Sequence, residues 1–298
     1  MKTQNLGKIA LLFLLALTLG MQSGQEVKQV QPLTPQLTAE DGQMTDETPA
    51  VWFVELMSPP LADGGSKAAI SQEKAAFRSL AKAAKLQYTE RYSFDNLWNG
   101  LSIQIEKSEL AKLNRMTGVK AVYPVIPISI PREPPGEETI ELYTALAMTG
   151  ADIAQSELGF TGRGIRVAVV DTGIDYDHPD LGSGFGAGHR VVTGWDFVGD
   201  AFNADSTSPS YNPVPVPDDD PDDCAGHGTH VSGIIGANGA ITGVAPNVNF
   251  GAYRVFGCQG STFADIMIAA MERALADGMD VLNMSIGSAY QWPEYPTA

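Results

Sequence analysis

The stretch IRVAVVDTG, residues 165–173, constrains the fold more than any other part of this 298-residue chain. Hydrophobic residues follow one another from Val167 to Val170, so the segment has no polar face to turn toward solvent. Strands of this composition are typically buried on both faces, as in a parallel sheet covered by helices. Asp171 ends the run and a Thr-Gly turn follows, which predicts a strand that stops at the carboxyl edge of such a sheet.

The segments that follow can supply the rest of the sheet. NFGAYRVF (249–256) and DVLNMSI (280–286) indicate strands, and TFADIMIAAMERALADG (262–278) indicates a helix with Thr262 as its N-cap. A strand, a helix and a strand joined by short links imply a right-handed crossover and a doubly wound, mostly parallel α/β sheet. Residues 199–223 are rich in Pro, Asp and Ser and are expected to form a surface loop.

An earlier part of the chain has a different pattern. Residues 51–123 alternate as strand, helix, strand, strand, helix and strand, which is the split βαβ arrangement of a small α+β, ferredoxin-like domain. Its first helix is the alanine-rich segment 66–87, and Ser108 is placed to cap the second. The proline-rich segment 124–140 is expected to be an extended connector and a natural site for proteolysis.

The amino terminus has the layout of a secretory signal peptide. Lys2 and Lys8 precede an apolar run from Ile9 to Gly20, and small and polar residues follow it. The run is shorter than the ~20 residues that span a bilayer, so a membrane anchor is the weaker interpretation. We therefore expect a secreted, extracellular protein without a membrane partner.

The expected organisation is a signal peptide at 1–24, a polar linker at 25–50, a small domain at 51–123, a connector at 124–140 and an α/β domain at 141–298.

Charge is distributed unevenly along the chain. Residues 51–131 contain 10 Lys or Arg against 7 Asp or Glu, whereas the chain from Glu133 onward contains 5 Arg, no Lys and 23 acids. This acidity argues against a nucleic-acid partner, because phosphate neutralisation needs clustered cations. A basic first part and an acidic second part could attract each other, although solubility of an exported protein explains the charge equally well.

The chain has two cysteines, Cys224 and Cys258. In an oxidising compartment an even number favours a mutual disulfide, and pairing with a cysteine outside this sequence is the competing interpretation.

Just after Cys224 comes AGHGTHVSG, a segment of helical length with His227 at its amino end. A helix start lowers the tendency of a histidine to be protonated, which suits a general base.

Two histidines three residues apart also resemble half of a zinc site. Zinc needs a third protein ligand and usually a glutamate base, but Gly228 and Thr229 stand between His227 and His230. We therefore expect no metal here, and interpret His230 as a packed helix residue, since a catalytic triad needs only one base.

Taken together, VAVVDTGIDYDHPDL and GHGTHVSGIIG resemble the aspartate and histidine motifs of the subtilisin-like serine proteases, in the chain order of that family. The resemblance extends to GVAPNVNFGAYRVF and AMERALADGMDVLNMSIG, and residues 51–123 resemble the family's propeptide, a folding chaperone and inhibitor. It implies that Asp171 orients the imidazole of His227, which acts as general base. It also implies protein or peptide substrates, and the chain's own propeptide as an intramolecular inhibitor. Substrate backbone would be bound by Gly260, Ser285, Ile286 and Gly287.

The sequence departs from the family pattern in two ways. The serines that follow His227 are Ser232, Ser261, Ser285 and Ser288, and none has the Gly-Thr-Ser-Met-Ala context of the nucleophile. We therefore expect the amino-terminal part of a protease precursor, inactive alone. Asp180 matches a calcium-ligand position, but the loop GANGAITG (236–243) is too short to supply the usual partners, so no cofactor is required and calcium is possible but not supported. The alternative function is that of a non-catalytic protease-binding protein, acting as inhibitor or chaperone through residues 51–123.

Overall fold

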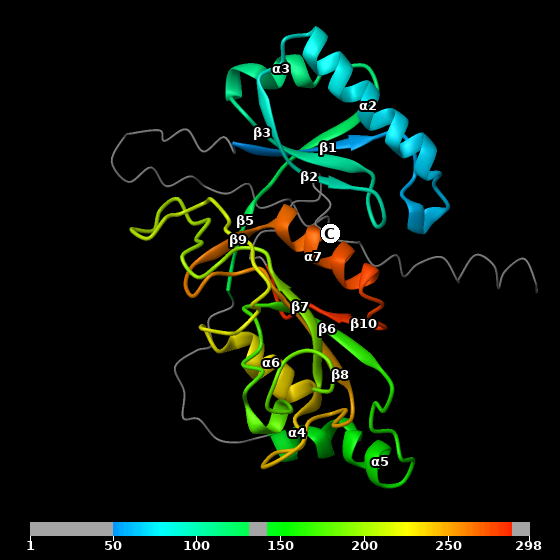
Figure 1. Cartoon of the computed structure of the whole chain (residues 1–298), viewed down its shortest axis with the longest axis vertical. Helices are drawn as coiled ribbons and strands as arrows, with labels where there is room; N and C mark the ends of the chain where they lie inside the picture. Colours follow the sequence, from blue (N-terminus) through cyan, green and yellow to red (C-terminus); the bar gives the residue numbers. More distant parts are fainter. Residues whose placement is uncertain (1–49, 131–141, 288–298) are drawn as a thin grey trace, which may run out of the picture. The chain divides into compact units, whose positions relative to one another are not determined.

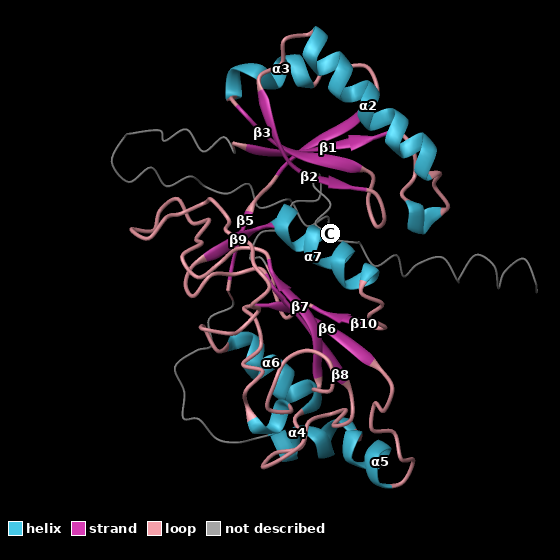
Figure 2. Ribbon diagram, in the orientation of Figure 1, coloured by secondary structure: helices cyan, strands magenta, loops and turns pink. Residues whose placement is uncertain are grey.

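The computed structural model describes residues 50–130 and 142–287. Two four-stranded sheets dominate it, one antiparallel and one parallel, and Figures 1 and 2 show them with their helices. In the described part of the chain, no helix is both long enough and apolar enough to cross a membrane.

The antiparallel sheet belongs to the first part of the chain. Its strands pair in the order β2-β3-β1-β4, and the helices α2 and α3 cover one face (Figure 1). Phe77 of α2 and Leu113 of α3 share a buried cluster with Val54, Leu101 and Ile103 of the sheet. This is the split βαβ arrangement that the sequence predicts. The elements are β1 (Val51–Leu56), α2 (Lys67–Ala83), β2 (Tyr88–Phe94), β3 (Gly100–Ile105), α3 (Leu110–Leu113) and β4 (Val119–Pro124).

The first helix of this domain is shorter than predicted, and the second begins differently. Lys85 adopts a left-handed conformation with φ 53°, which ends α2 before residue 87. Ser108 lies inside a 3-10 helix, Lys107–Glu109, and caps nothing, because Glu109 holds the position before α3 and makes no side-chain cap bond. The prediction of a Ser108 cap was therefore wrong.

The parallel sheet pairs its strands in the order β10-β6-β8-β7. The alternation along β6 explains why helices cover both faces. Val167 and Val169 pack in one buried cluster with Val231 of α6, whereas Ala168 and Val170 pack in another with helix α7. The predicted doubly wound α/β sheet is confirmed. The elements are β6 (Arg166–Asp171), β7 (Val191–Asp196), α6 (His227–Gly236), β8 (Asn249–Arg254), α7 (Ala264–Ala276) and β10 (Val281–Asn283).

The pairing of two short strands changes the predicted start of α7. β5 (Pro127–Ser129) pairs antiparallel with β9 (Ser261–Phe263), and Ile128 lies opposite Thr262. Thr262 is therefore an extended, fully buried strand residue and not an N-cap. Phe263 holds the position before the helix and makes no side-chain cap bond.

The remaining helical segments are short. α4 (Leu142–Thr149) and α5 (Ala151–Ser156) precede β6, and 3-10 helices are formed by Leu61–Asp63 and Pro179–Leu181. Residues 199–223 contain no helix or strand, in agreement with the predicted loop, and are tied down by isolated bridges such as Asn203 to Asn212.

Candidate active site

The predicted acid and base meet at the carboxyl edge of the parallel sheet. Asp171 is the last residue of β6 and His227 is the first residue of α6. The Nδ1 atom of His227 lies 2.6 Å from Oδ1 of Asp171. The aspartate side chain is fully buried and that of the histidine is 14% exposed. With Nδ1 held by the carboxylate, Nε2 is the ring nitrogen left to exchange a proton with another group.

The pKa of Asp171 reflects opposing effects. Burial raises it above its ordinary value, whereas the hydrogen bonds from His227 and from the backbone N–H of Thr172 lower it. Thr172 N donates to Oδ1 at 2.7 Å, so the same oxygen serves both partners. The second oxygen, Oδ2, is buried and has no hydrogen-bond partner among the described residues.

The glycines around His227 allow the helix to approach the strand. A Cβ atom at Gly228 would lie 2.1 Å from the carbonyl oxygen of Gly173, and 3.2 Å from Cβ of Asp171. Gly173 itself has φ 111°, a conformation that disfavours side chains. The glycines therefore let α6 come close enough to the end of β6 for the 2.6 Å contact between His227 and Asp171.

His230 does not join this pair in a metal site. It lies exposed on α6, so the interpretation of His230 as a packed helix residue was wrong. Among the described residues, the only three-residue group with metal-ligand spacing is Asp200, Cys224 and Cys258, and there the two cysteines are bonded to each other. The structure thus offers no third ligand beside His227 and His230 in its described part.

A disulfide links the two segments that flank the site. The sulfurs of Cys224 and Cys258 are 2.06 Å apart, so the structure contains the mutual bridge. Cys224 precedes His227 by three residues, and Cys258 precedes Gly260 by two. The bridge therefore ties the start of the histidine helix to the predicted substrate-lining segment.

Arg254, which the sequence analysis missed, lies beside this bridge. It is 3% exposed, and its Nη2 atom lies 3.0 Å from Sγ of Cys224. Its guanidinium also pairs with Asp196 at 3.2 Å and Asp200 at 2.8 Å. Burial raises the pKa of Asp196, although Arg254 opposes that effect. The sequence signal that could have singled out Arg254 is its position as the one charged residue of strand β8.

The predicted substrate-binding residues lie on two strand ends. The carbonyl of Gly260 accepts a hydrogen bond from Ile130 N at 3.5 Å, which extends the β5–β9 pairing by one residue. Ser285, Ile286 and Gly287 follow β10, and Ser285 Oγ accepts a bond from Asn283 Nδ2 at 3.0 Å. Residues 127–130 of the connector thus lie as a strand along the Gly260 segment.

The small domain is held against α7 by charged groups that sequence reasoning did not single out. Asp265, fully buried, accepts bonds from Arg91 Nε at 2.7 Å and from Ser102 Oγ at 2.8 Å. About two turns further along, Glu272 accepts the backbone N–H groups of Asn96 at 2.9 Å and Leu97 at 3.1 Å. Helix α7 therefore presents carboxylates to β2, β3 and the turn between them.

The residues around Asp180 do not fit a calcium ion. Oδ1 accepts the N–H of Ala240 at 2.9 Å and Oδ2 accepts that of Ile241 at 3.1 Å. These donors lower the pKa of Asp180. Calcium requires several oxygen ligands, whereas the loop turns N–H groups toward this carboxylate. Both carboxylate oxygens are therefore already used by the loop itself.

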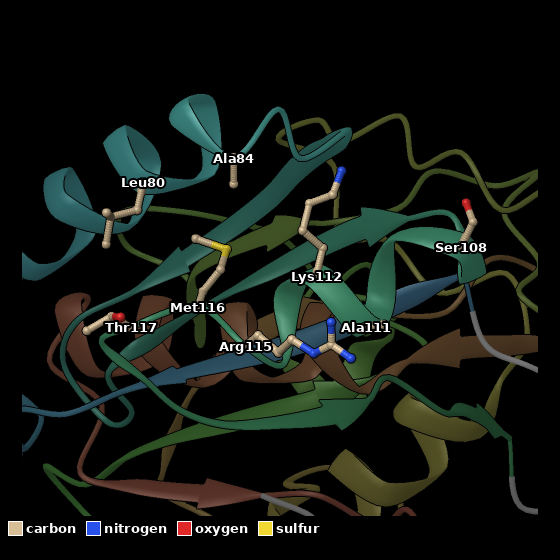
Figure 3. A pocket seen from close by; sticks show the side chains of 8 residues that line it. All are labelled: Leu80, Ala84, Ser108, Ala111, Lys112, Arg115, Met116 and Thr117. Atoms are coloured by element: carbon tan, nitrogen blue, oxygen red, sulfur yellow. The ribbon is translucent and has the colours of Figure 1, made fainter.

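A pocket of about 520 Å³ lies elsewhere, between the end of α2 and α3 (Figure 3). Lys112, Arg115 and Met116 are among its lining residues. It contains none of the predicted site residues, so the candidate active site is defined by the Asp171–His227 pair and not by this pocket.

A buried aspartate that orients a histidine at the edge of a doubly wound sheet has the geometry used in serine-dependent acyl transfer. Comparison with known families agrees with that class. Residues 162–297 match the model of the subtilase family, and residues 61–128 match the model of peptidase inhibitor I9. Over residues 162–297 the chain belongs to the subtilase family, and an inhibitor I9 propeptide domain precedes that part.

Individual relatives are proteases of the same kind. Minor extracellular protease Vpr of Bacillus subtilis is 34% identical over 273 residues, which are 87% of this chain and 32% of the relative. Subtilisin of Bacillus sp. strain TA39 is 31% identical over 272 residues, 81% of this chain and 58% of the relative. The chain thus spans about a third to three fifths of the length of these two proteins.

A solved structure supports the fold. The crystal structure of the S393A mutant of the epidermin leader peptide processing serine protease of Staphylococcus aureus aligns with a TM-score of 0.55 at 23% identity. The alignment covers 79% of this chain and 50% of that one.

Proposed function

We propose that this chain is part of the precursor of a secreted, subtilisin-like serine endopeptidase. The observation that carries the proposal is the 2.6 Å contact between His227 Nδ1 and the buried carboxylate of Asp171. The subtilase and inhibitor I9 matches support it. The charged and apolar run at residues 1–24 and the name of the extracellular relative support secretion.

In the proposed reaction His227 acts through its free Nε2 atom. It takes the proton of a serine hydroxyl as that oxygen attacks the substrate carbonyl, and then gives the proton to the leaving amine. Asp171 holds the imidazole in the required tautomer and stabilises its charged form. No serine after His227 in these 298 residues has the family's nucleophile context, so we assign the nucleophile and the oxyanion-hole donor to a segment outside them.

Residues 51–123 are proposed to act as propeptide, an inhibitor and folding chaperone of the same protein. The contacts of Asp265 and Glu272 with this domain support a docked arrangement. The β5 strand on Gly260 supports occupation of the proposed substrate strand by the connector. Maturation would then require cleavage within the predicted connector, residues 124–140.

The test uses the full-length gene product, assayed on an unstructured protein substrate after maturation. Asp171→Asn and His227→Ala are expected to reduce kcat by roughly four to six orders of magnitude, the range known for subtilisin itself. His230→Ala, three residues further along the same helix, is the matched control and should retain hydrolysis. Retained activity in the His227→Ala protein would reject the proposal.

The second candidate is a non-catalytic protein that binds proteases through residues 51–123. The inhibitor I9 match and the docking contacts on α7 favour it. It predicts inhibition of a subtilisin-type protease by the chain and no hydrolysis by the full-length gene product at any stage of processing.

A further inference from the structure

The side chain of Asp223 lies between the two elements that carry the candidate acid and base. Its carboxylate accepts five hydrogen bonds. Oδ1 accepts Thr172 Oγ1, Ala225 N and Gly226 N, each at 2.9 Å. Oδ2 accepts Thr229 N at 2.9 Å and Thr229 Oγ1 at 2.6 Å. An ionised carboxylate accepts hydrogen bonds at both oxygens and donates none, and here three donors share Oδ1.

These five donors come from both sides of the Asp171–His227 contact. Thr172 is the residue directly after the aspartate, and Gly226 is the residue directly before the histidine. Gly226 is the N-cap of α6 and Thr229 lies in its first turn, and the N–H groups at these positions have no partner within the helix. Asp223 therefore satisfies the start of the histidine helix and at the same time bonds the turn that follows the aspartate.

Two further bonds close the network. Thr172 Oγ1 accepts the N–H of Gly228 at 2.8 Å, and Thr229 Oγ1 accepts the N–H of Asp175 at 2.9 Å. Both threonines thus donate to Asp223 and accept from the opposite element. The hydroxyl groups of Thr172 and Thr229 therefore link the end of β6 to the start of α6, and both donate to the Asp223 carboxylate.

We infer that Asp223 is a positioning residue for the proposed protease, one that fixes the distance between Asp171 and His227 through Thr172 and Thr229. The inference rests on the proposed function for its catalytic consequence, but its structural consequence does not require activity. The alternative explanation is that Asp223 affects His227 only through its negative charge, and not through its hydrogen bonds.

A substitution at the neighbouring Asp222 distinguishes the two explanations. Its carboxylate is exposed and accepts a bond from the N–H of Asp223 itself, at 2.9 Å. Asp222→Asn removes the same charge one residue away and leaves the five bonds of Asp223 in place. Asp223→Asn removes the charge too, but replaces one acceptor oxygen with an NH₂ group that faces existing donors.

The first readout is a proton NMR spectrum of the chain itself. The proton between His227 Nδ1 and Asp171 should give a downfield signal, assigned by its loss in His227→Ala. The signal is expected to move upfield or disappear in Asp223→Asn and to stay in place in Asp222→Asn. Because an Asp223→Asn protein could fail to fold, Thr172→Val provides a second test. It removes the Thr172 hydroxyl, which bonds Asp223 and Gly228 N–H, and keeps the bonds of Asp223 to Ala225, Gly226 and Thr229. It should shift the same signal by a smaller amount.

The second readout is steady-state kinetics of the full-length gene product. Asp223→Asn is expected to lower kcat by about 100-fold, as a displaced catalytic group does, with KM within about threefold. Thr172→Val is expected to lower kcat by about 10-fold, and Asp222→Asn should match the unmodified protein within about twofold. An unchanged proton signal in both Asp223→Asn and Thr172→Val, or equal kcat losses in Asp222→Asn and Asp223→Asn, would overturn the inference. If His227→Ala kept its activity, the proposed function would fail, and the proton signal alone would still decide the role of Asp223.

Discussion

The guanidinium of Arg91 lies 2.7 Å from the carboxylate of Asp265, although 174 residues separate them along the chain. The aspartate side chain is fully buried and the arginine is 13% exposed. The pair joins β2 of the small domain to the first turn of α7. Arg91 also stacks over the ring of Phe263, 5.3 Å from its centre. A basic first part and an acidic second part thus meet at one specific, desolvated ion pair.

Arg91→Ala is expected to destabilise the chain by about 3 kcal/mol, because the carboxylate of Asp265 remains buried without its cation. Ser102 Oγ would still donate to that carboxylate, which keeps the loss from being larger. The measurement is the free energy of unfolding in urea. Arg115→Ala, which removes an exposed arginine from the same domain, is the control and should change stability by less than about 0.5 kcal/mol. Equal urea midpoints for the two variants would contradict the importance assigned to the pair.

The disulfide gives a second prediction. Cys224 and Cys258 are separated by 34 residues, so their bridge restricts the unfolded chain by roughly 3–4 kcal/mol in the loop-entropy account. The double variant Cys224→Ser, Cys258→Ser should lose about that much stability in urea. Reductant supplies the internal control, because it should lower the midpoint of the unmodified chain and leave that of the double variant unchanged. If the reductant lowered the urea midpoint of both proteins, its effect would not come from this disulfide.

Local patterns were sufficient to predict the elements that carry the site. The apolar run before Asp171 predicted a buried strand, and the segment AGHGTHVSG predicted a helix with His227 at its amino end. Both follow from neighbours in the sequence, and the subtilase resemblance assigned their roles. The 2.6 Å contact itself needed the fold, since only the packing of Gly228 on Gly173 brings the two side chains together.

Other features depend on residues far apart, and sequence patterns did not show them. Thr262 looked like a helix cap because a helical segment follows it, but pairing with Ile128 holds it in a strand. Tertiary pairing therefore overrode a local signal. Asp265 is an acid in the first turn of α7, and nothing near it in the sequence indicates that its partners come from β2 and β3 of the small domain. Asp223 likewise looked like one acid of an acidic loop, and only its five donors distinguish it from Asp222.

The loop at Asp180 gives a prediction for pH and metal dependence. Its pKa is lowered by the N–H groups of Ala240 and Ile241. A lowered pKa means that the ionised carboxylate contributes stability above the ordinary value of 3.8 and loses it as the pH falls through the folded-state pKa. The thermal midpoint of Asp180→Asn should therefore lie below that of the unmodified chain at pH 7, and the difference should shrink in acid below pH 3.8.

Two controls accompany this measurement. Asp219→Asn, at an exposed acid, should leave the thermal midpoint nearly unchanged at both pH values. A chelator should not alter the difference between Asp180→Asn and the unmodified chain, because the loop's own N–H groups occupy the carboxylate. A chelator that abolished the difference would instead indicate a cation at Asp180.

Gly260 gives the last prediction, because its backbone and its surroundings both exclude a side chain. Its φ is 98°, and a Cβ atom there would lie 2.1 Å from Oδ1 of Asn203. That oxygen accepts the N–H groups of Ser261 at 3.1 Å and Asp205 at 2.9 Å, so moving it would disturb β9. Gly260→Ala should therefore lose more stability than backbone strain alone explains.

Gly164 makes this comparison possible, since its φ of 85° is similar and nothing lies within 4 Å of a Cβ built there. Gly164→Ala is expected to cost about 1–2 kcal/mol, the price of a left-handed conformation with a side chain. Gly260→Ala should cost roughly 1–3 kcal/mol more, through the clash with Asn203. Urea unfolding of both variants measures the difference. Because β5 pairs with β9, the Gly260 variant should also digest faster in the 124–130 segment under limited proteolysis, whereas Gly164→Ala should not. Equal stability losses and equal digestion rates would mean that Asn203 yields freely and that Gly260 is a turn residue without a role in holding the strand.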